Sequence, residues 1–288
     1  MRAGLKAAVV VLPFLVAFLF IRSCSEGEAE RWRNRIREHD PEAVLGIEED
    51  DLIVIAPSPD EAAAVAATVR GFRHALVDQY GDLLGRPRQH RMVVVQFSSE
   101  ERLRHYAGDR MLHDPERANV LQGYTDPEHG AIFLPPESEP ETLRHEVVHW
   151  VVDTAHRGTA AYSPWLNEGL AQLFEVYDPD AWPPVEPGIG PRDRENMGAL
   201  LRDNTLDVDR LIRLDDYRDF TVVEGSRNYL EALVLTAFLF LERPRETLLE
   251  YLRLERESDV GRPMAFHSAF RDETFDRDLR AFIARMKR

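Results

Sequence analysis

Two histidines and two glutamates near the middle of the chain have the residue types and the spacing of a hydrolytic metal site. His145, Glu146 and His149 form an H-E-x-x-H motif, and Glu168 follows after eighteen intervening residues. Residues four apart on a helix share one face, so both imidazoles can reach one ion. Glu146 lies about 100° further around the helix, where it can reach a water molecule at the metal instead.

The four residues fit the division of labour that zinc-dependent hydrolysis requires. Two neutral imidazoles and one carboxylate hold catalytic zinc and leave the fourth position for water. The metal lowers the pKa of that water toward about 7, and a nearby carboxylate takes its proton. The pattern therefore predicts Zn²⁺ bound by His145, His149 and Glu168, with Glu146 as the general base. A solvated helix face that carries the same residue types is the alternative interpretation.

The sequence around the motif predicts the first of two helices that would position these residues. Pro140 suits the first turn, and Gly158 suits the end. Its apolar stripe consists of Leu143, Val147, Trp150 and Val151, with His145, His149 and Asp153 on the other side. The helix is thus expected to pack by one face and to present its histidines on the other.

The second helix repeats this logic after a short loop. Ser163 suits the N-cap and Pro164 the first helical position. The apolar stripe consists of Leu166, Leu170, Leu173 and Tyr177, with Glu168, Gln172 and Glu175 opposite. A loop over residues 158 to 162 would let the two helices turn antiparallel and bring Glu168 over the histidine pair.

The spacing H-E-x-x-H, eighteen residues, then Glu-Gly and an apolar helix resembles the gluzincin zinc peptidases, which include thermolysin and a group of aminopeptidases. The segment WLNEGLA, residues 165 to 171, is most similar to the same segment of peptidase-MA-like domain proteins. The close likeness covers residues 141 to 175, and a looser one extends over roughly residues 45 to 288. The resemblance implies the same roles for the two histidines and two glutamates.

The resemblance also implies residues around the metal. Gluzincins often supply a downstream tyrosine or histidine to stabilise the oxyanion, and Tyr229 matches that position; a tyrosine that packs by its ring is the alternative. Thermolysin-like members orient a histidine with an aspartate four residues past the glutamate ligand. This chain has Gln172 there, and Asp153 is either a substitute or a plain exposed aspartate. The chain has no GAMEN-type aminopeptidase motif, which leaves endo- or exopeptidase specificity open.

Length and charge limit the classes of function. The chain has 288 residues, of which 44% are hydrophobic and 30% charged, enough for one large or two small domains. Its formal net charge of −15 argues against nucleic-acid binding, because a phosphate-binding surface is usually basic. The acidity is expected to serve solubility and to favour basic or neutral substrates.

Residues 1 to 24 predict a membrane segment. Arg2 and Lys6 come first, and an unbroken apolar run follows from Ala7 to Ile21. The run reaches the roughly 20 residues of a membrane span if Ala3 to Leu5 are added. We expect an uncleaved anchor that leaves the rest of the chain outside the cytoplasm; a cleaved signal peptide with secretion, and lipidation of Cys24, are the alternatives. Cys24 is the only cysteine, so no internal disulfide can form.

The remaining chain predicts an α+β fold. We expect a charged linker over residues 25 to 44 and one peptidase domain over residues 45 to 288. This domain would consist of a small mixed α/β part (45 to 136) and a mainly helical part (137 to 288), with a thermolysin-like zinc site between them. In the α/β part we expect strands at 51 to 56 and 91 to 97, a helix at 59 to 84, and a hairpin of 119 to 124 with 130 to 134. Of these, GAIFL (130 to 134) is the candidate edge strand for pairing with an extended peptide, or else an ordinary sheet strand. In the helical part we expect a modest helix at 206 to 217, a buried one at 229 to 241, and about three amphipathic helices after residue 245.

The sequence as a whole predicts a membrane-tethered zinc peptidase that acts on a peptide or protein substrate. The main alternative is a non-catalytic module in which zinc stabilises a cleft that binds a peptide without cutting it. The intact Glu146 favours the enzyme, since a site without catalysis does not need a general base.

Overall fold

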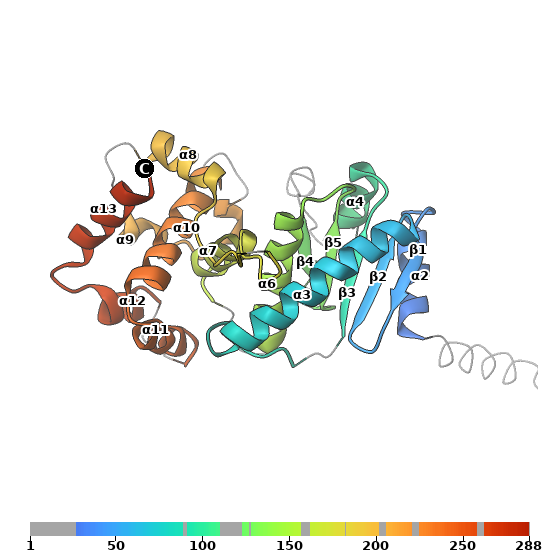
Figure 1. Ribbon diagram of the computed structural model, residues 1–288, viewed down its shortest axis with the longest axis horizontal. Coiled ribbons are helices and arrows are strands. Elements are labelled where there is room, and N and C mark those ends of the chain that lie inside the picture. Colours follow the sequence, from blue (N-terminus) through green and yellow to red (C-terminus); the bar gives the residue numbers. More distant parts are fainter. Residues whose placement is uncertain are drawn as a thin grey trace, which may run out of the picture.

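The protein consists of a sheet with its covering helices at one end and a helical part at the other, which confirms the α+β class (Figure 1). The computed structural model describes residues 27–88, 91–109, 123–126, 128–156, 162–181, 183–201, 206–220, 225–257 and 262–287. The expected membrane segment over residues 1 to 24 lies outside these ranges. Within them, no helix combines the length and the apolar character needed to cross a membrane.

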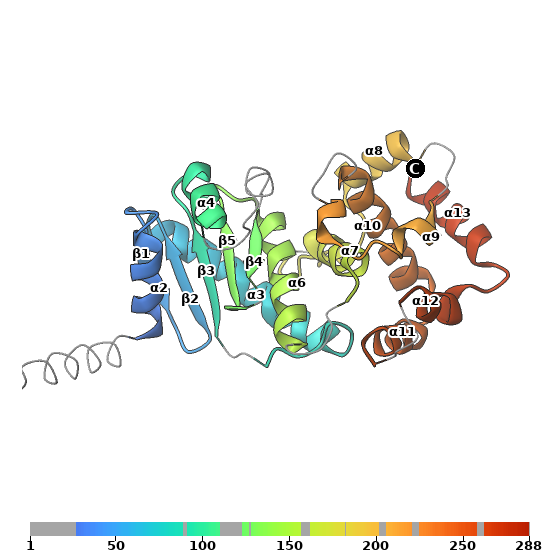
Figure 2. The same ribbon diagram turned by 180° about the vertical axis from the view of Figure 1, so that it is seen from behind.

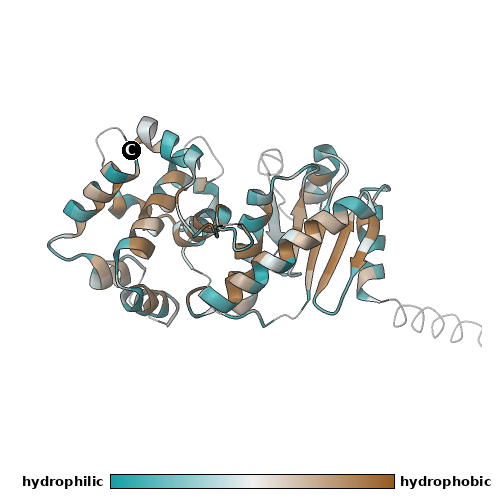
Figure 3. Ribbon diagram, viewed as in Figure 1, coloured by the Kyte–Doolittle hydropathy of each residue, from teal (hydrophilic) through white to brown (hydrophobic). Residues whose placement is uncertain are grey.

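Five strands of the described chain form one mixed sheet with the order β1-β2-β3-β5-β4. They are β1 (Val44–Glu48), β2 (Leu52–Ala56), β3 (Met92–Gln96), β4 (Tyr124–Asp126) and β5 (Ala131–Leu134). β2, β3 and β5 are parallel, while β1 and β4 pair antiparallel at the two edges. The three central strands are buried at every position and hydrophobic throughout most of their length, as strands covered on both faces must be (Figure 3).

One face of the sheet is covered by α2 (Glu28–Arg37) and α4 (Glu100–Ala107). α2 carries many charges, but Ala29, Trp32 and Ile36 recur at helical spacing and are buried against the sheet. We expected a charged linker over residues 25 to 44. The described part of that stretch contains a helix that packs on the sheet and leads into β1.

The other face of the sheet is covered by α3 (Pro59–Leu84) and α6 (Pro140–Ala155). Both helices begin where the sequence predicted, each with a proline in the first turn. The predicted apolar stripe of α6 is buried in the main core. Trp150 of this stripe also donates its indole N–H to the Gly130 carbonyl at 2.7 Å, which fixes α6 on the turn between β4 and β5.

The helical part is organised around α10 (Gly225–Glu242), which confirms the expected buried helix (Figure 2). The other helices of this part are α7 (Pro164–Glu175), α8 (Pro191–Leu200), α9 (Val208–Leu211), α11 (Arg245–Glu257), α12 (Arg262–Phe270) and α13 (Phe275–Met286). The last three are the amphipathic helices expected after residue 245. The helix expected over 206 to 217 is shorter and is followed by a 3₁₀ turn at Tyr217–Phe220.

The backbones of α7 and α10 approach closely at Gly169. A Cβ atom at this position would lie 2.6 Å from the Ala232 carbonyl oxygen, nearer than real Cβ contacts allow. The glycine of the WLNEGLA segment therefore permits the tight packing that buries α7 between α6 and α10. That packing fixes the helix that carries Glu168.

Candidate metal centre

α6 and α7 form an antiparallel pair that is fastened at one end by Arg144. Its guanidinium donates to the Glu175 carbonyl oxygen and to the Asp178 carboxylate, both at 3.1 Å, so the start of α6 lies beside the end of α7. This confirms the antiparallel arrangement expected for the two helices. Residues 157 to 161, most of the expected loop between them, lie outside the described residues.

The N-terminus of α7 is held by a carboxylate on α11. Ser163 occupies the predicted N-cap position, but its side chain makes no capping hydrogen bond. Its backbone N–H instead donates to the buried carboxylate of Glu255 on α11, at 2.5 Å. A carboxylate at a helix N-terminus satisfies a free N–H group and is favoured by the helix dipole. Both ends of α7 are therefore anchored.

The structure brings His145, His149 and Glu168 together around one point. The two Nε2 atoms are 3.0 Å apart, and Glu168 Oε2 lies 3.4 Å from His145 Nε2 and 3.5 Å from His149 Nε2. The point equidistant from these three atoms lies about 1.9 Å from each, close to the zinc bond lengths of about 2.0–2.2 Å to nitrogen and oxygen. The three side chains thus already have the spacing of ligands to one ion.

The charges around this point also favour a cation. Glu168 Oε2 is buried and accepts no hydrogen bond within the described ranges. Burial raises the pKa of Glu168, but the neighbouring imidazoles of His149 and His145 outweigh this and bring it to about 2. Burial has the opposite effect on His145 and lowers its pKa. The carboxylates of Glu168 and Glu175 outweigh this effect and hold the pKa of His145 well above its usual value. The carboxylates that favour a proton on His145 would equally favour a divalent cation in place of that proton, so the donor set fits zinc in geometry and in charge.

Glu175 is a partner of the site that the sequence interpretation missed. Its Oε1 lies 2.8 Å from His145 Nδ1, so the Nδ1–H group can donate to it and leave Nε2 free to face the metal point. Such carboxylates orient the imidazole and raise its strength as a ligand. Glu175 follows Glu168 by two helical turns on the same face of α7, and that spacing was the signal available in the sequence.

Replacing Glu175 with alanine should lower zinc affinity by about 10–100-fold, because His145 loses the group that orients it. Glu175→Gln, which keeps an acceptor oxygen, should lose less. Zinc affinity can be measured by competition with a chromophoric chelator. Glu141→Ala is the matched control, since Glu141 is an exposed carboxylate in the first turn of α6. Equal affinity of Glu175→Ala and the control would contradict the role of Glu175.

The histidine-orienting role for which Asp153 was one candidate is not found, and Gln172 does not supply it either. The Gln172 amide donates to the backbone carbonyls of Glu168 (3.4 Å) and Tyr229 (3.0 Å), so it links α7 to α10. His149 Nδ1 is buried and has no hydrogen-bond partner within the described ranges, so Asp153 does not orient it. Burial raises the pKa of Asp153 to about 6, although the nearby His149 opposes that rise.

Glu146 is buried beside the histidines and is held by the edge strand β4. Thr125 Oγ1 lies 2.7 Å from Glu146 Oε2 and 2.9 Å from the Glu146 carbonyl oxygen, so the hydroxyl can donate to either. Thr125 pairs with Ile132 of β5, whose side chain lies on the face covered by α6. A Cβ atom at Gly123 would lie 2.9 Å from Glu146 Oε1, so the glycine leaves room for the carboxylate. Neither Thr125 nor Gly123 was singled out from the sequence.

The edge of the sheet nearest the site is β4 and not the strand we expected. β5, which contains most of GAIFL, pairs with β3 on one side and with β4 on the other. It is an ordinary sheet strand, so the prediction that it offers a free edge is wrong. An antiparallel pair is present as expected, but its first strand is Tyr124–Asp126, later in the chain than the predicted 119 to 124, of which residues 119 to 122 lie outside the described ranges.

Tyr229 lies in the first turns of α10, close to the helix that carries Glu168. Its ring packs edge-on against Phe220 with the centroids 5.3 Å apart, and its backbone carbonyl accepts from Gln172. These contacts place the residue beside α7. The proposed action of its hydroxyl on an oxyanion stays a prediction.

The fold and the site together define a two-part α+β protein with a preformed His-His-Glu centre at the junction of the two parts. A scan against models of known protein families finds none that matches this chain, and a search of curated proteins also finds no match. The function is therefore argued from the site.

Proposed function

We propose that the protein is a zinc-dependent peptidase. The observation that carries this proposal is the convergence of His145 Nε2, His149 Nε2 and Glu168 Oε2 within 3.5 Å of one another, with the Glu146 carboxylate beside them. The ligand side chains are 8% to 15% exposed, so the centre is shielded but open enough for a water molecule to reach. A resident structural zinc would typically have four protein ligands, whereas the described residues supply three to this group.

Zinc bound by these residues would supply the acidity that lets water attack at neutral pH and would polarise the carbonyl of the substrate. Glu146 takes the proton from the attacking water and passes it to the leaving amine. Thr125 holds the Glu146 carboxylate in position by a hydrogen bond. Glu175 keeps the Nδ1 atom of His145 protonated so that Nε2 faces the metal. Tyr229 is the proposed hydrogen-bond donor to the oxyanion.

The substrate that suits this arrangement is a peptide segment in an extended conformation. β4 is the edge of the sheet next to Glu146, and its outer side has no strand partner among the described strands. An extended chain can pair with such an edge through its backbone. We propose further that residues 1 to 24 tether the enzyme to a membrane with its catalytic part outside the cytoplasm.

The proposed activity can be tested by digestion of a peptide library with the zinc-loaded full-length chain. We expect new peptide ends that disappear when a chelator removes the metal and return when zinc is added back. Mass spectrometry of the ends would give the cleavage preference and would separate endo- from exopeptidase activity. Zinc binding without cleavage of any peptide would favour the non-catalytic binding module instead.

A further inference from the structure

A second group of side chains that can bind a metal lies between the end of α2 and α4, on the opposite face of the sheet from α6. His39 follows the end of α2, while His105 lies in the last turn of α4 and Asp109 just beyond it. Each residue offers a ligand atom, and these atoms lie within 4.8 Å of one another. The two Nδ1 atoms are 3.2 Å apart, close to the 3.0 Å between the ring nitrogens of His145 and His149.

The backbone positions of this group are fixed by packing and hydrogen bonds. Asp40, next to His39, is fully buried and accepts from the Ser98 backbone N–H at 2.7 Å and from the Arg102 guanidinium at 2.5 Å. The His39 ring packs edge-on against Tyr106, with the centroids 5.2 Å apart. The turn after α2 is therefore held against α4 whether or not an ion is present.

The side chains that face the ion retain freedom to adjust. His105 is 65% exposed and Asp109 54% exposed, so both can turn without breaking the core. Asp109 Oδ2 lies 3.7 Å from His105 Nε2, whereas His39 faces the other ring nitrogen, Nδ1, so the exposed side chain of Asp109 or of His105 must turn for all three to bind one ion. Two imidazoles and one carboxylate are ligands that borderline divalent metals such as Zn²⁺, Co²⁺ and Ni²⁺ accept.

We propose that His39, His105 and Asp109 form a second, peripheral site for a divalent transition metal, which fastens the end of α2 to α4. With three protein ligands at an exposed position, the site would keep water on the ion and bind more weakly than the buried centre. It does not depend on the proposed peptidase activity, because it shares no residue with that centre.

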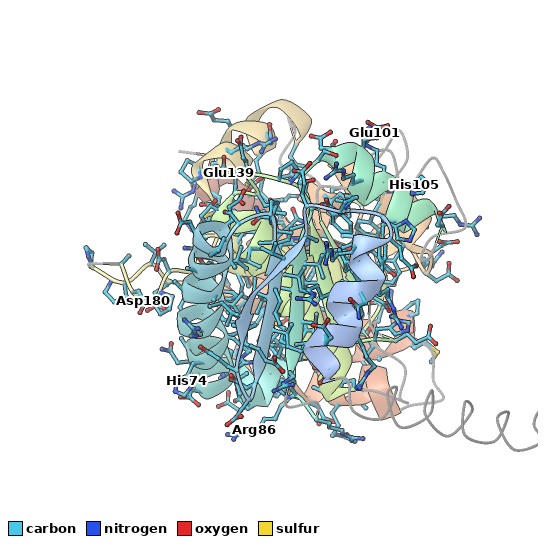
Figure 4. The ribbon with its side chains drawn as sticks, turned by 90° about the vertical axis from the view of Figure 1, so that its right-hand side faces the viewer. His74, Arg86, Glu101, His105, Glu139 and Asp180 are labelled. Carbon is cyan, nitrogen blue, oxygen red and sulfur yellow. The ribbon has the colours of Figure 1, made fainter. Side chains whose placement is uncertain are left out.

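The chain offers a matched control for this site. His74 and Asp78 on α3 have the same four-residue spacing as His105 and Asp109, with Nε2 and Oδ2 3.0 Å apart. No third ligand joins them in any metal-binding group of the described residues. Figure 4 shows His74 and His105 on opposite sides of the molecule. His74→Ala therefore removes an equivalent exposed histidine without touching the proposed site.

The test is a zinc titration of the chelator-stripped full-length chain, with bound metal counted by elemental analysis. We expect two equivalents for the wild type and for His74→Ala, and one each for His105→Ala and His149→Ala. Asp109→Asn should raise the dissociation constant of the weaker site at least about tenfold. Binding of Co²⁺, followed by its visible absorption, should show the same loss in His105→Ala.

Two outcomes would overturn the proposal. One is a wild-type chain that binds a single equivalent, lost only in His149→Ala, since His39 and His105 would then be a hydrogen-bonded pair without a metal. The other is equal zinc binding by His105→Ala and His74→Ala. If His149→Ala keeps its metal while His105→Ala loses one equivalent, the peripheral site stands and the proposed catalytic centre fails.

Discussion

Glu146→Gln should lower peptide cleavage by about 10²–10⁴-fold while the protein keeps its zinc, because the amide cannot take a proton from water. The side-chain size is unchanged, and the amide oxygen can still accept a hydrogen bond from Thr125. The buried environment of residue 146 should therefore be preserved. The measurements are kcat/KM on the best peptide from the library digest and zinc content by elemental analysis.

Glu141→Gln is the control for this substitution, because it makes the same chemical change on an exposed part of the same helix. It should cleave like the wild type. Wild-type turnover in Glu146→Gln would remove Glu146 from the mechanism. Loss of zinc in that variant would instead mean that Glu146 supports the ligands, and the kinetic result would then say nothing about a base.

His149→Ala should release the central zinc and with it all cleavage. The variant leaves only two ligands and an open space where the ring was. Zinc affinity should therefore fall by more than the roughly 10–100-fold expected when a residue that only orients a ligand, such as Glu175, is lost. The loss can be measured as metal content after dialysis against a weak chelator. Far-UV circular dichroism would check that the helices remain.

The control for His149→Ala is His129→Ala. His129 lies at the turn between β4 and β5, where its Nδ1 atom is 2.7 Å from Asp126 Oδ2. Among the described residues it belongs to no group that could bind a metal. It should keep the central zinc and its activity. Stoichiometric tightly bound zinc in His149→Ala would contradict the ligand set.

The convergence of the three proposed ligands was predictable because the signals for it are local in the sequence. The four-residue spacing of His145 and His149 fixes a shared helix face, and the prolines at 140 and 164 mark the starts of the two helices. The packing of α7 was also encoded locally, in its apolar stripe. These features specify the pair of helices before any contact with the rest of the chain is known.

Contacts between distant segments were not predictable in the same way. Thr125 reaches Glu146 only because β4 lies at the edge of the sheet, and strand order is not written in the strand sequences. For the same reason the sequence could not decide whether GAIFL is an edge strand or an ordinary inner strand. Glu255 caps α7 from 92 residues away, and no spacing rule points to such a partner.

The charged stretch after residue 25 was misinterpreted for a different reason. Ala29, Trp32 and Ile36 do form a helical stripe, but only three of ten residues in α2 are buried and the rest are mostly charged. A narrow stripe of this kind looks like a solvated helix until a partner surface is known. His39 lies just after this helix, and its partner His105 is 66 positions away, so no local spacing connects the two residues.

The ligands of the central site belong to different halves of the molecule. The two histidines lie on α6, which packs on the sheet, while Glu168 lies on α7, which packs on α10. An ion there binds only when α6 and α7 are packed together, and it stabilises that packing by an amount that grows with the logarithm of the free ion concentration above its dissociation constant. Metal affinity and the packing of these two helices are then thermodynamically linked, so a change in one must change the other. Substitutions on α10 at residues that contact no ligand would therefore change the affinity of the site for the metal.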